Sequence, residues 1–281
     1  MNKIVLSLLL LALPSAGFAK DGEADFYSDI FSDQTLTFTT ALGFQQKKKK
    51  IWTADVEGMK RDLDGVHAAL EKCKACGFRV RSRAPGIEWY EGSWVTSEGE
   101  KLRLVLRLLY PDEGVDAVSL VQNFNEAVMD DDVVFYGGHS RNGLRFPSFA
   151  APTSYGGSNF YYNPDERGWR GFDAWKKRRD RQQLLVVNSC KTKNYFQEPL
   201  QQHAKKLGLP LWLILTLEDN HLRDTPAVFS ALLTNILEKT PLDQLPAVLQ
   251  ETADHYNAFH FMDAVQKPLF ELVRGFDFVN R

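Results

Sequence analysis

Three short runs of apolar residues stand out in the hydrophobic pattern of the chain. They span residues 133–140 (VVFYGGHS), 184–190 (LLVVNSC) and 211–217 (LWLILTL), and each has the length of a β-strand. Runs that are apolar at nearly every position are typical of parallel strands covered on both faces, whereas half-exposed strands alternate. The first run leads into His139 and the second into Cys190.

The segments around these runs predict an α/β order. Helical periodicity predicts amphipathic helices at 55–77, 115–129, 225–238 and from 242 to about 270. Alternation and β-forming residues predict strands at 36–44 and 78–83, which with the first helix form a strand–helix–strand unit with a right-handed parallel crossover. We therefore expect a three-layer α/β fold with a mostly parallel central sheet flanked by helices.

Other segments are expected to lie outside the sheet. Residues 45–50 read as a solvated loop, and an acidic partner for their lysines is the less favoured interpretation. Residues 85–97 read as an aromatic loop, and 98–110 is ambiguous but favours a helix because Thr96 and Ser97 offer N-caps. Residues 172–183 read as a basic helix. The long segment 141–170 is expected to be a ligand-facing loop or a surface decoration.

The amino terminus has the pattern of an export signal. Lys3 precedes an apolar stretch at 4–13, and Gly17-Phe18-Ala19 resembles a cleavage site, so we expect a signal peptide over 1–19. The organisation predicted after it is a loose segment at 20–35 and one α/β domain at 36–281, with a C-terminal helical extension from about 242. No other apolar run is long enough to span a membrane. The expected location is the periplasm or the cell exterior.

Composition narrows the possible partners. The 281 residues carry a formal net charge of −2, which gives no general attraction to nucleic acid. Aromatic residues make up 12% of the chain, a content that argues against a disordered chain. The oligomeric state stays open.

Three cysteines in an exported chain make an odd number. Cys73 and Cys76 are close enough in sequence to form a disulfide. A redox motif would normally open a helix, whereas this pair lies at a predicted helix end, and a zinc site would need a second pair of ligands. Cys190 is then left over, either as a reactive thiol or as a buried inert cysteine.

His139 and Cys190 together suggest nucleophilic catalysis, because open α/β proteins place their sites just beyond the carboxyl ends of parallel strands. The alternative for His139 is a packed turn in which the imidazole satisfies backbone groups. The other histidines have no recognisable ligand spacing, and we expect neither a metal nor a cofactor.

Three segments give the chain a resemblance to a known family. DLDGVHAALEKCKACGFRV, VVFYGGHSRNG and LLVVNSC resemble the caspase-like cysteine peptidases, which include caspases, metacaspases, legumain and the gingipains. That family places a His at the end of one parallel strand and a Cys at the end of the next. His139 and Cys190 are 51 residues apart (190 − 139 = 51), close to the roughly 50 of caspases. The resemblance covers about residues 36–239.

The resemblance implies a peptidase with a Cys190–His139 dyad that acts on a peptide or protein through an acyl-enzyme, or a transpeptidase with the same intermediate. It implies oxyanion contacts from the Cys190 backbone and from the Gly138–Ser140 turn. Ser140 stands where the family usually has Gly. Arg141 and Lys191 are candidate contacts for the thiol or the substrate. The alternative function is a catalytically inactive domain that binds a peptide or a cell-envelope glycan through the aromatic residues of 155–169.

Overall fold

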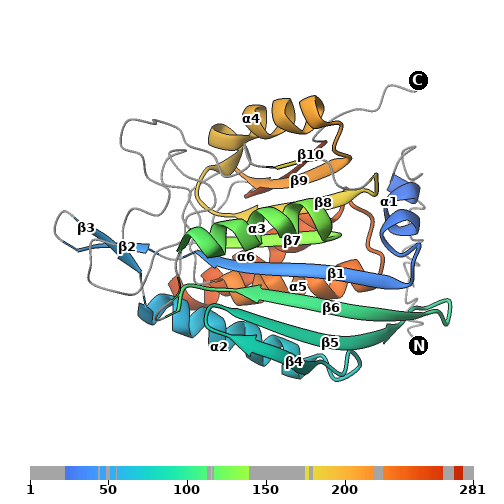
Figure 1. Cartoon of the computed structure of the whole chain (residues 1–281), viewed down its shortest axis with the longest axis horizontal. Coiled ribbons are helices and arrows are strands. Elements are labelled where there is room, and N and C mark those ends of the chain that lie inside the picture. Colours follow the sequence, from blue (N-terminus) through green and yellow to red (C-terminus); the bar gives the residue numbers. More distant parts are fainter. Residues whose placement is uncertain are drawn as a thin grey trace, which may run out of the picture.

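The protein is an α/β structure built around one large sheet (Figure 1). A computed structural model describes residues 23–43, 45–48, 51–54, 56–112, 115, 117–138, 175–176, 180–217, 224–261 and 269–274. The segment 141–170, expected to be a ligand-facing or decorative loop, lies outside them.

In this part of the chain, eight strands form the sheet in the order β10-β9-β8-β7-β1-β6-β5-β4. Their bounds are β1 Thr35–Gly43, β4 Arg79–Ala84, β5 Ile87–Val95, β6 Lys101–Leu109, β7 Val133–Gly138, β8 Gln183–Asn188, β9 Leu211–Thr216 and β10 Phe270–Arg274. The neighbours from β6 through β1, β7 and β8 to β9 are parallel, and β4, β5 and β10 join antiparallel. The sheet is therefore mostly parallel at its centre, as the sequence predicts.

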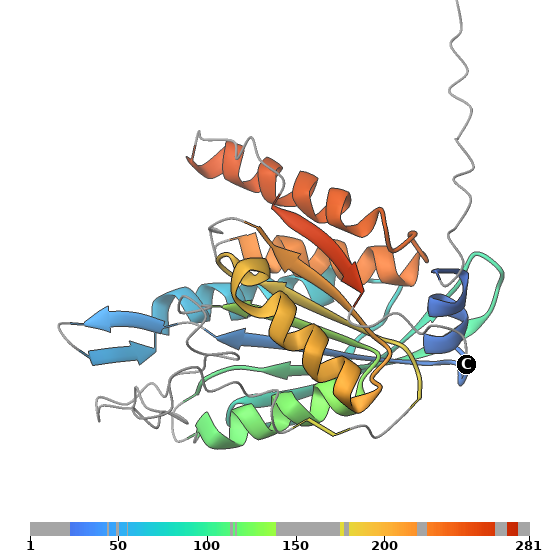
Figure 2. The ribbon, with the colours of Figure 1, turned by 90° about the horizontal axis from the view of Figure 1, so that it is seen from above.

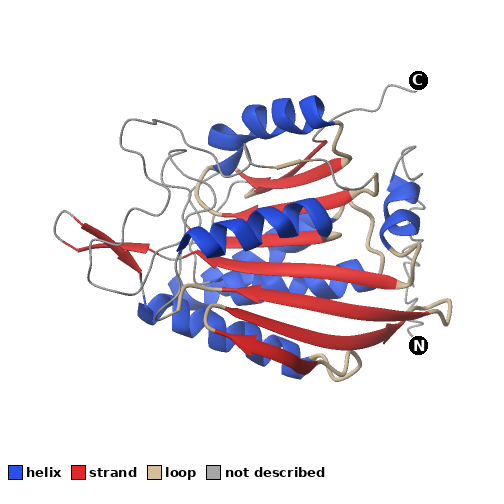
Figure 3. Ribbon diagram, in the orientation of Figure 1, coloured by secondary structure: helices blue, strands red, loops and turns tan. Residues whose placement is uncertain are grey.

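Helices cover both faces of this sheet (Figures 2 and 3). One face carries α2 (Val56–Lys72), α5 (Thr225–Leu237) and α6 (Leu245–Phe261), and the other carries α3 (Ala117–Asp130) and α4 (Thr192–Leu207). Every residue of β7, β8 and β9 is buried, because alternate side chains enter the two helix-covered cores. In β7, for example, Val133 and Phe135 face one core while Val134 and Tyr136 face the other.

The region between residues 85 and 110 differs from the prediction. It forms the hairpin of β5 and β6 rather than an aromatic loop and a helix. Along β6, Leu102, Leu104, Leu106 and Leu108 are buried on one face, whereas Lys101 and Arg103 are exposed. Arg103 and Arg107 are four residues apart, and four is a multiple of the strand period as well as close to one helical turn. Their spacing therefore cannot separate a strand from a helix.

The predicted strand–helix–strand unit is also rearranged. Residues 79–84 do form a strand, β4, but it is the antiparallel edge of the sheet. The parallel neighbour of β1 on that side is β6. The helix that precedes β4 ends at Lys72, five residues before the predicted end at Gly77.

Both ends of the described chain are more closely integrated than predicted. In the segment expected to be loose, α1 (Glu23–Ile30) lies at the amino edge of the sheet with Phe26 and Ile30 fully buried. In the expected helical extension, α6 packs on α5, and β10 then pairs with β9. The extension thus completes the main sheet.

Two charged segments also differ from their predicted structure. Of the predicted lysine-rich loop, Gln45–Lys48 form a strand, β2, which pairs with β3 (Ile51–Ala54) and projects beyond the carboxyl edge of β1 (Figure 1). The basic helix predicted at 172–183 is absent at its described positions: residues 175–176 and 180–182 are not helical, and Gln183 begins β8.

A buried carboxylate fastens α2 to the outer hairpin. Glu88 of β5 is 5% exposed, and its oxygens are contacted by groups from α2, β4 and β5 and from the residue that follows β6. Its partners are His67 Nε2 at 3.0 Å, the donating hydroxyl of Tyr110 at 3.1 Å, the hydroxyl of Tyr90, and Arg83 Nε at 3.4 Å. Burial alone would raise the pKa of Glu88, but the hydrogen bond from Tyr90 and the charge of His67 outweigh it and lower that pKa. Burial and the same contact raise the pKa of Tyr90 to about 12.

We expect Phe229→Ala to lower the free energy of unfolding by about 3–5 kcal/mol, because Phe229 is fully buried with its ring 5.8 Å from Phe38 and 6.3 Å from Phe135. Urea denaturation measures the change. Val80→Ala, at a position that is 45% exposed, serves as the control and should change stability by no more than about 0.5 kcal/mol. Equal effects of the two substitutions would contradict the packing described for this core.

Glu88 should make stability depend on acid pH. Its pKa in the folded protein is below the usual 4.5, so its contribution is present above pH 4.5 and is lost as the pH falls through the lowered value. Glu88→Gln should therefore reduce stability at pH 7 by about 1–3 kcal/mol and flatten the loss on acidification. Urea midpoints at pH 7 and in acid test this, with the exposed Glu251→Gln as the control. If Glu88→Gln lost as much stability on acidification as the unsubstituted protein does, Glu88 would not be the source of this pH dependence.

Candidate functional site

The candidate site is the carboxyl edge of the sheet at β7 and β8. These strands are parallel neighbours, with Val133 paired to Leu184 and Gly137 to Asn188. The register offset is 51 residues along the pair (184 − 133 = 51 and 188 − 137 = 51). Both strands thus end at the same edge, and Cys190 lies two residues beyond the last residue of β8.

The described residues include only part of the predicted catalytic group. Gly138 is the last residue of β7, and Cys190 and Lys191 form the turn after β8. His139 follows Gly138 directly in the sequence, but His139, Ser140 and Arg141 lie outside the described residues.

Cys190 lies in a tight connection between a strand and a helix. It is partly buried and is not disulfide-bonded. The next residue, Lys191, has left-handed backbone angles (φ 50°, ψ 37°) and is the N-cap of α4. A non-glycine residue in this conformation costs about 1–2 kcal/mol. The chain therefore accepts local strain to turn directly from the Cys190 position into the amino terminus of a 16-residue helix.

A pair of buried threonines holds this turn in place. Thr216, at the end of β9, donates its backbone N–H to Thr192 Oγ1 at 2.8 Å, and the Thr192 N–H donates to Thr216 Oγ1 at 3.2 Å. The Thr216 hydroxyl also donates to the Ser189 carbonyl. Both threonines are fully buried. The residues on either side of Cys190 and Lys191 are thus anchored to the neighbouring strand.

The amino end of α5 packs against the same edge. Asn188, the last residue of β8, donates its side-chain N–H to Asp224 Oδ1 at 3.3 Å, and both residues are fully buried. At Gly137, a Cβ atom would collide with the Thr225 methyl group. Glycine at this position therefore permits the close approach of α5 to β7.

Gly138 is restricted in a similar way by its other neighbour. A Cβ at this residue would meet the Gly43 carbonyl of β1 and the Tyr136 hydroxyl. The Gly-Gly sequence therefore reflects tight backbone packing at the strand end as well as any role in binding an oxyanion.

Sequence reasoning missed five residues that support the turn: Asn188, Ser189, Thr192, Thr216 and Asp224. For Asn188, Ser189 and Thr216 the signal was a small polar residue at the end of a strand-length apolar run, and for Asp224 it was an acidic residue directly before Thr225-Pro226. The first signal places its residues at the sheet edge, but neither signal says which residues meet.

Cys73 and Cys76 form a disulfide in the turn after α2, with their Cα atoms 5.3 Å apart. The Cys76 carbonyl accepts a hydrogen bond from the Ser93 N–H at 2.8 Å. Ser93 pairs with Arg103 near the start of β6, so the disulfide lies toward the amino edge of the parallel strands. It is therefore at the opposite edge from Cys190.

Among the described residues, no group of three or more His, Cys, Asp or Glu side chains is arranged to hold a metal ion. Within the same residues, no helix has the length and apolar character needed to cross a membrane. No protein-family model matches the chain, and no curated protein matches it either.

We expect Thr192→Val to destabilise the protein by about 1–3 kcal/mol, because it leaves the buried N–H of Thr216 without its acceptor. Thr192→Ser keeps the hydroxyl and is the matched control, so it should retain most of the stability. Urea denaturation distinguishes the two. If Val and Ser were equally tolerated, the threonine pair would not be what holds the turn.

Proposed function

We propose that the protein is a cysteine peptidase of the caspase-like kind, with Cys190 as nucleophile and His139 as the group that moves the proton. One observation carries this proposal. The register offset between β7 and β8 is 51 residues, and the same number of residues separates His139 from Cys190. β7 and β8 therefore end side by side, with Gly138 directly before His139 in the sequence and Asn188 two residues before Cys190. Neighbouring strands are about 4.8 Å apart, so the chain leaves β7 and β8 at points close enough to support a dyad across their ends.

The surroundings of Cys190 support a nucleophile. Its side chain is partly exposed rather than sealed in the core, as attack on a substrate requires. The turn places it one residue before the N-cap of α4. The positive end of a helix dipole favours a thiolate over a neutral thiol. The strained Lys191 and the anchored Thr192 fit a residue held in one orientation.

The proposed reaction has two steps. The Cys190 sulfur attacks the peptide carbonyl carbon, and the C–N bond breaks as His139 gives its proton to the leaving amine, which leaves an acyl-enzyme. Water then attacks the acyl carbon, His139 takes its proton, and the thiolate is released with the new carboxyl group. The Cys190 N–H and an N–H of the Gly138–Ser140 turn would stabilise the oxyanion, an effect of about 3 kcal/mol. With an amine in place of water, the same intermediate would give a transpeptidase.

We also propose that the protein works outside the cytoplasm. The disulfide between Cys73 and Cys76 fits an oxidising compartment, and the amino-terminal pattern fits an export signal.

The first test is the pH dependence of alkylation. An unperturbed thiol has a pKa of about 8.5 and would react roughly 300-fold more slowly at pH 6 than at its plateau. We expect Cys190 to react with iodoacetamide at pH 6 within about tenfold of its plateau rate. In His139→Ala, we expect the rate at pH 6 to fall to that of an unperturbed thiol. Mass mapping under non-reducing conditions identifies the labelled residue, and His255→Ala is the matched control.

Activated labelling should be accompanied by cleavage in a peptide library, and Cys190→Ala should remove that cleavage. Slow labelling at pH 6 that is unaffected by His139→Ala would reject the dyad. It would favour the inactive domain that binds peptide or glycan through residues 155–169.

A further inference from the structure

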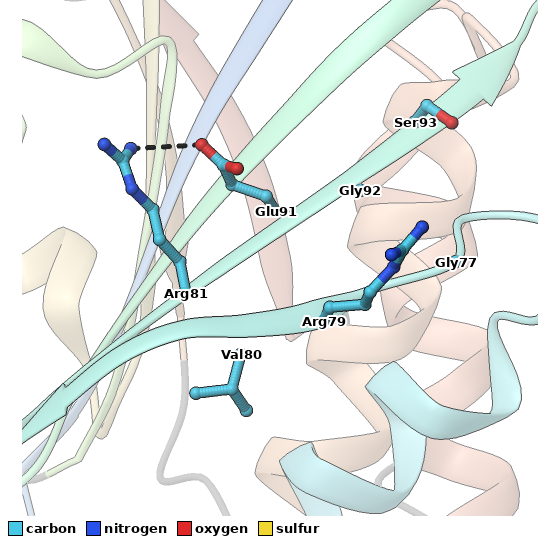
Figure 4. A pocket seen from close by; sticks show the side chains of 7 residues that line it. All are labelled: Gly77, Arg79, Val80, Arg81, Glu91, Gly92 and Ser93. Carbon is cyan, nitrogen blue, oxygen red and sulfur yellow. Dashed lines mark ion pairs between the residues drawn. The ribbon is translucent and has the colours of Figure 1, made fainter.

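A second candidate site lies on the outer hairpin of the sheet. A pocket of about 390 Å³ opens where the edge strand β4 meets β5 (Figure 4). Its lining residues are Gly77, Arg79, Val80, Arg81, Glu91, Gly92 and Ser93. Every residue of β4 is exposed, so a ligand can reach the pocket directly.

The pocket has an excess of positive charge. Arg81 Nη1 lies 3.1 Å from Glu91 Oε1, and Arg103 Nη2 lies 2.5 Å from the same oxygen. One carboxylate is thus shared by two guanidinium groups. The hydrogen bond from Arg103 lowers the pKa of Glu91 and keeps it ionised. Arg79 makes no ion pair or side-chain hydrogen bond within the described part of the chain. The lining thus contains two arginines and one carboxylate, and that carboxylate is also paired with Arg103 from outside the pocket.

A β-bulge determines which arginines face the pocket. Arg79 and Arg81 are two positions apart and point to the same side of β4, whereas Val80 points away (Figure 4). The pairing with β5 shifts between Val80 and Ser82. After this shift, Arg83 lies on the opposite face and contacts Glu88. Without the bulge, Arg83 would continue the row of Arg79 and Arg81.

The disulfide turn holds the part of the pocket wall next to Arg79. Cys76 is fully buried, and its carbonyl accepts the Ser93 N–H. Gly92 has no room for a Cβ, which would collide with the Cys76 carbonyl and crowd the ring of Phe78. The turn closed by Cys73 and Cys76 is therefore pinned onto β5, and it sets the position of Gly77 at the pocket.

We propose that this pocket binds a small ligand through an oxyanion group, either a phosphate or a carboxylate. The Arg79 guanidinium, which extends toward the Ser93 side of the pocket in Figure 4, supplies paired N–H donors of the geometry that such groups accept, and the Ser93 hydroxyl is a further donor. Arg81, turned toward Glu91 on the same side of β4, adds a second positive charge. Glu91 holds Arg81 in place without neutralising the group of arginines. The site is several strands away from Cys190 in the sheet order and does not depend on the proposed peptidase activity.

Isothermal titration of the full chain with pyrophosphate and with citrate, at low ionic strength, tests this site. We expect saturable binding of at least one of them with one site per chain. Arg79→Gln and Arg81→Gln should each weaken it by roughly tenfold or more, because each removes a charge-assisted contact. Tighter binding of pyrophosphate would identify a phosphate site, and tighter binding of citrate a carboxylate site.

Lys101→Gln is the matched control, because it removes the same charge from the exposed start of β6 without touching the pocket. It should leave the affinity nearly unchanged. Arg79→Lys keeps the charge but loses the paired donors, and should bind with intermediate affinity. Absence of saturable binding by either anion would overturn the proposal. An equal loss in Lys101→Gln and Arg79→Gln would also overturn it, because it would show only general attraction to a basic surface.

Discussion

Burial of the central parallel strands on both faces is the constraint on which the rest of the structure depends. β7, β8 and β9 have no exposed residue, so no side chain within them can meet a substrate. Polar chemistry is confined to the places where these strands end. At the carboxyl edge, the chain leaves β8 through Asn188, Ser189 and Cys190, and buried hydrogen bonds engage the Asn188 side chain and the Ser189 carbonyl. The hydrogen bonds that join this turn to β9 are buried in the same way as the strands.

The outer part of the sheet is exposed at its edge rather than buried on both faces, and its candidate site is a surface pocket. The hairpin of β4 and β5 has an exposed edge, where strands are commonly protected by charged residues and bulges. Here those features also produce a pocket lined by Arg79 and Arg81, beside the turn that the disulfide closes. On the face toward α2, Glu88 ties the hairpin to His67. One face of the β4–β5 pair thus attaches the hairpin to α2, whereas the other face carries the exposed pocket.

Much of the central fold could be predicted from local pattern. The runs that became β7, β8 and β9 were recognisable because double-sided burial requires apolar residues at every position. The candidate site was recognisable for a related reason, since a reactive residue directly after such a run has to emerge at a sheet edge. The outer strands could not be predicted in this way. In β6, Arg103 and Arg107 fit a helix and a strand equally well, and α1 was obscured by acidic residues that in fact bind Arg181 and the Gln182 backbone.

The sequence by itself determined the α/β class, the central strands, and the placement of Cys190 just beyond a buried strand, because each of these follows from the burial pattern of a single segment. Only the tertiary structure decided that β6 rather than β4 lies beside β1, that Thr192 meets Thr216, and that Arg79 and Arg81 share a pocket while Arg83 turns away. These features depend on contacts between segments distant in sequence and on a one-residue shift in strand register. Long-range contacts and register shifts do not change the hydrophobic periodicity of a single segment. The free energy that selects them arises only when the strands pack together.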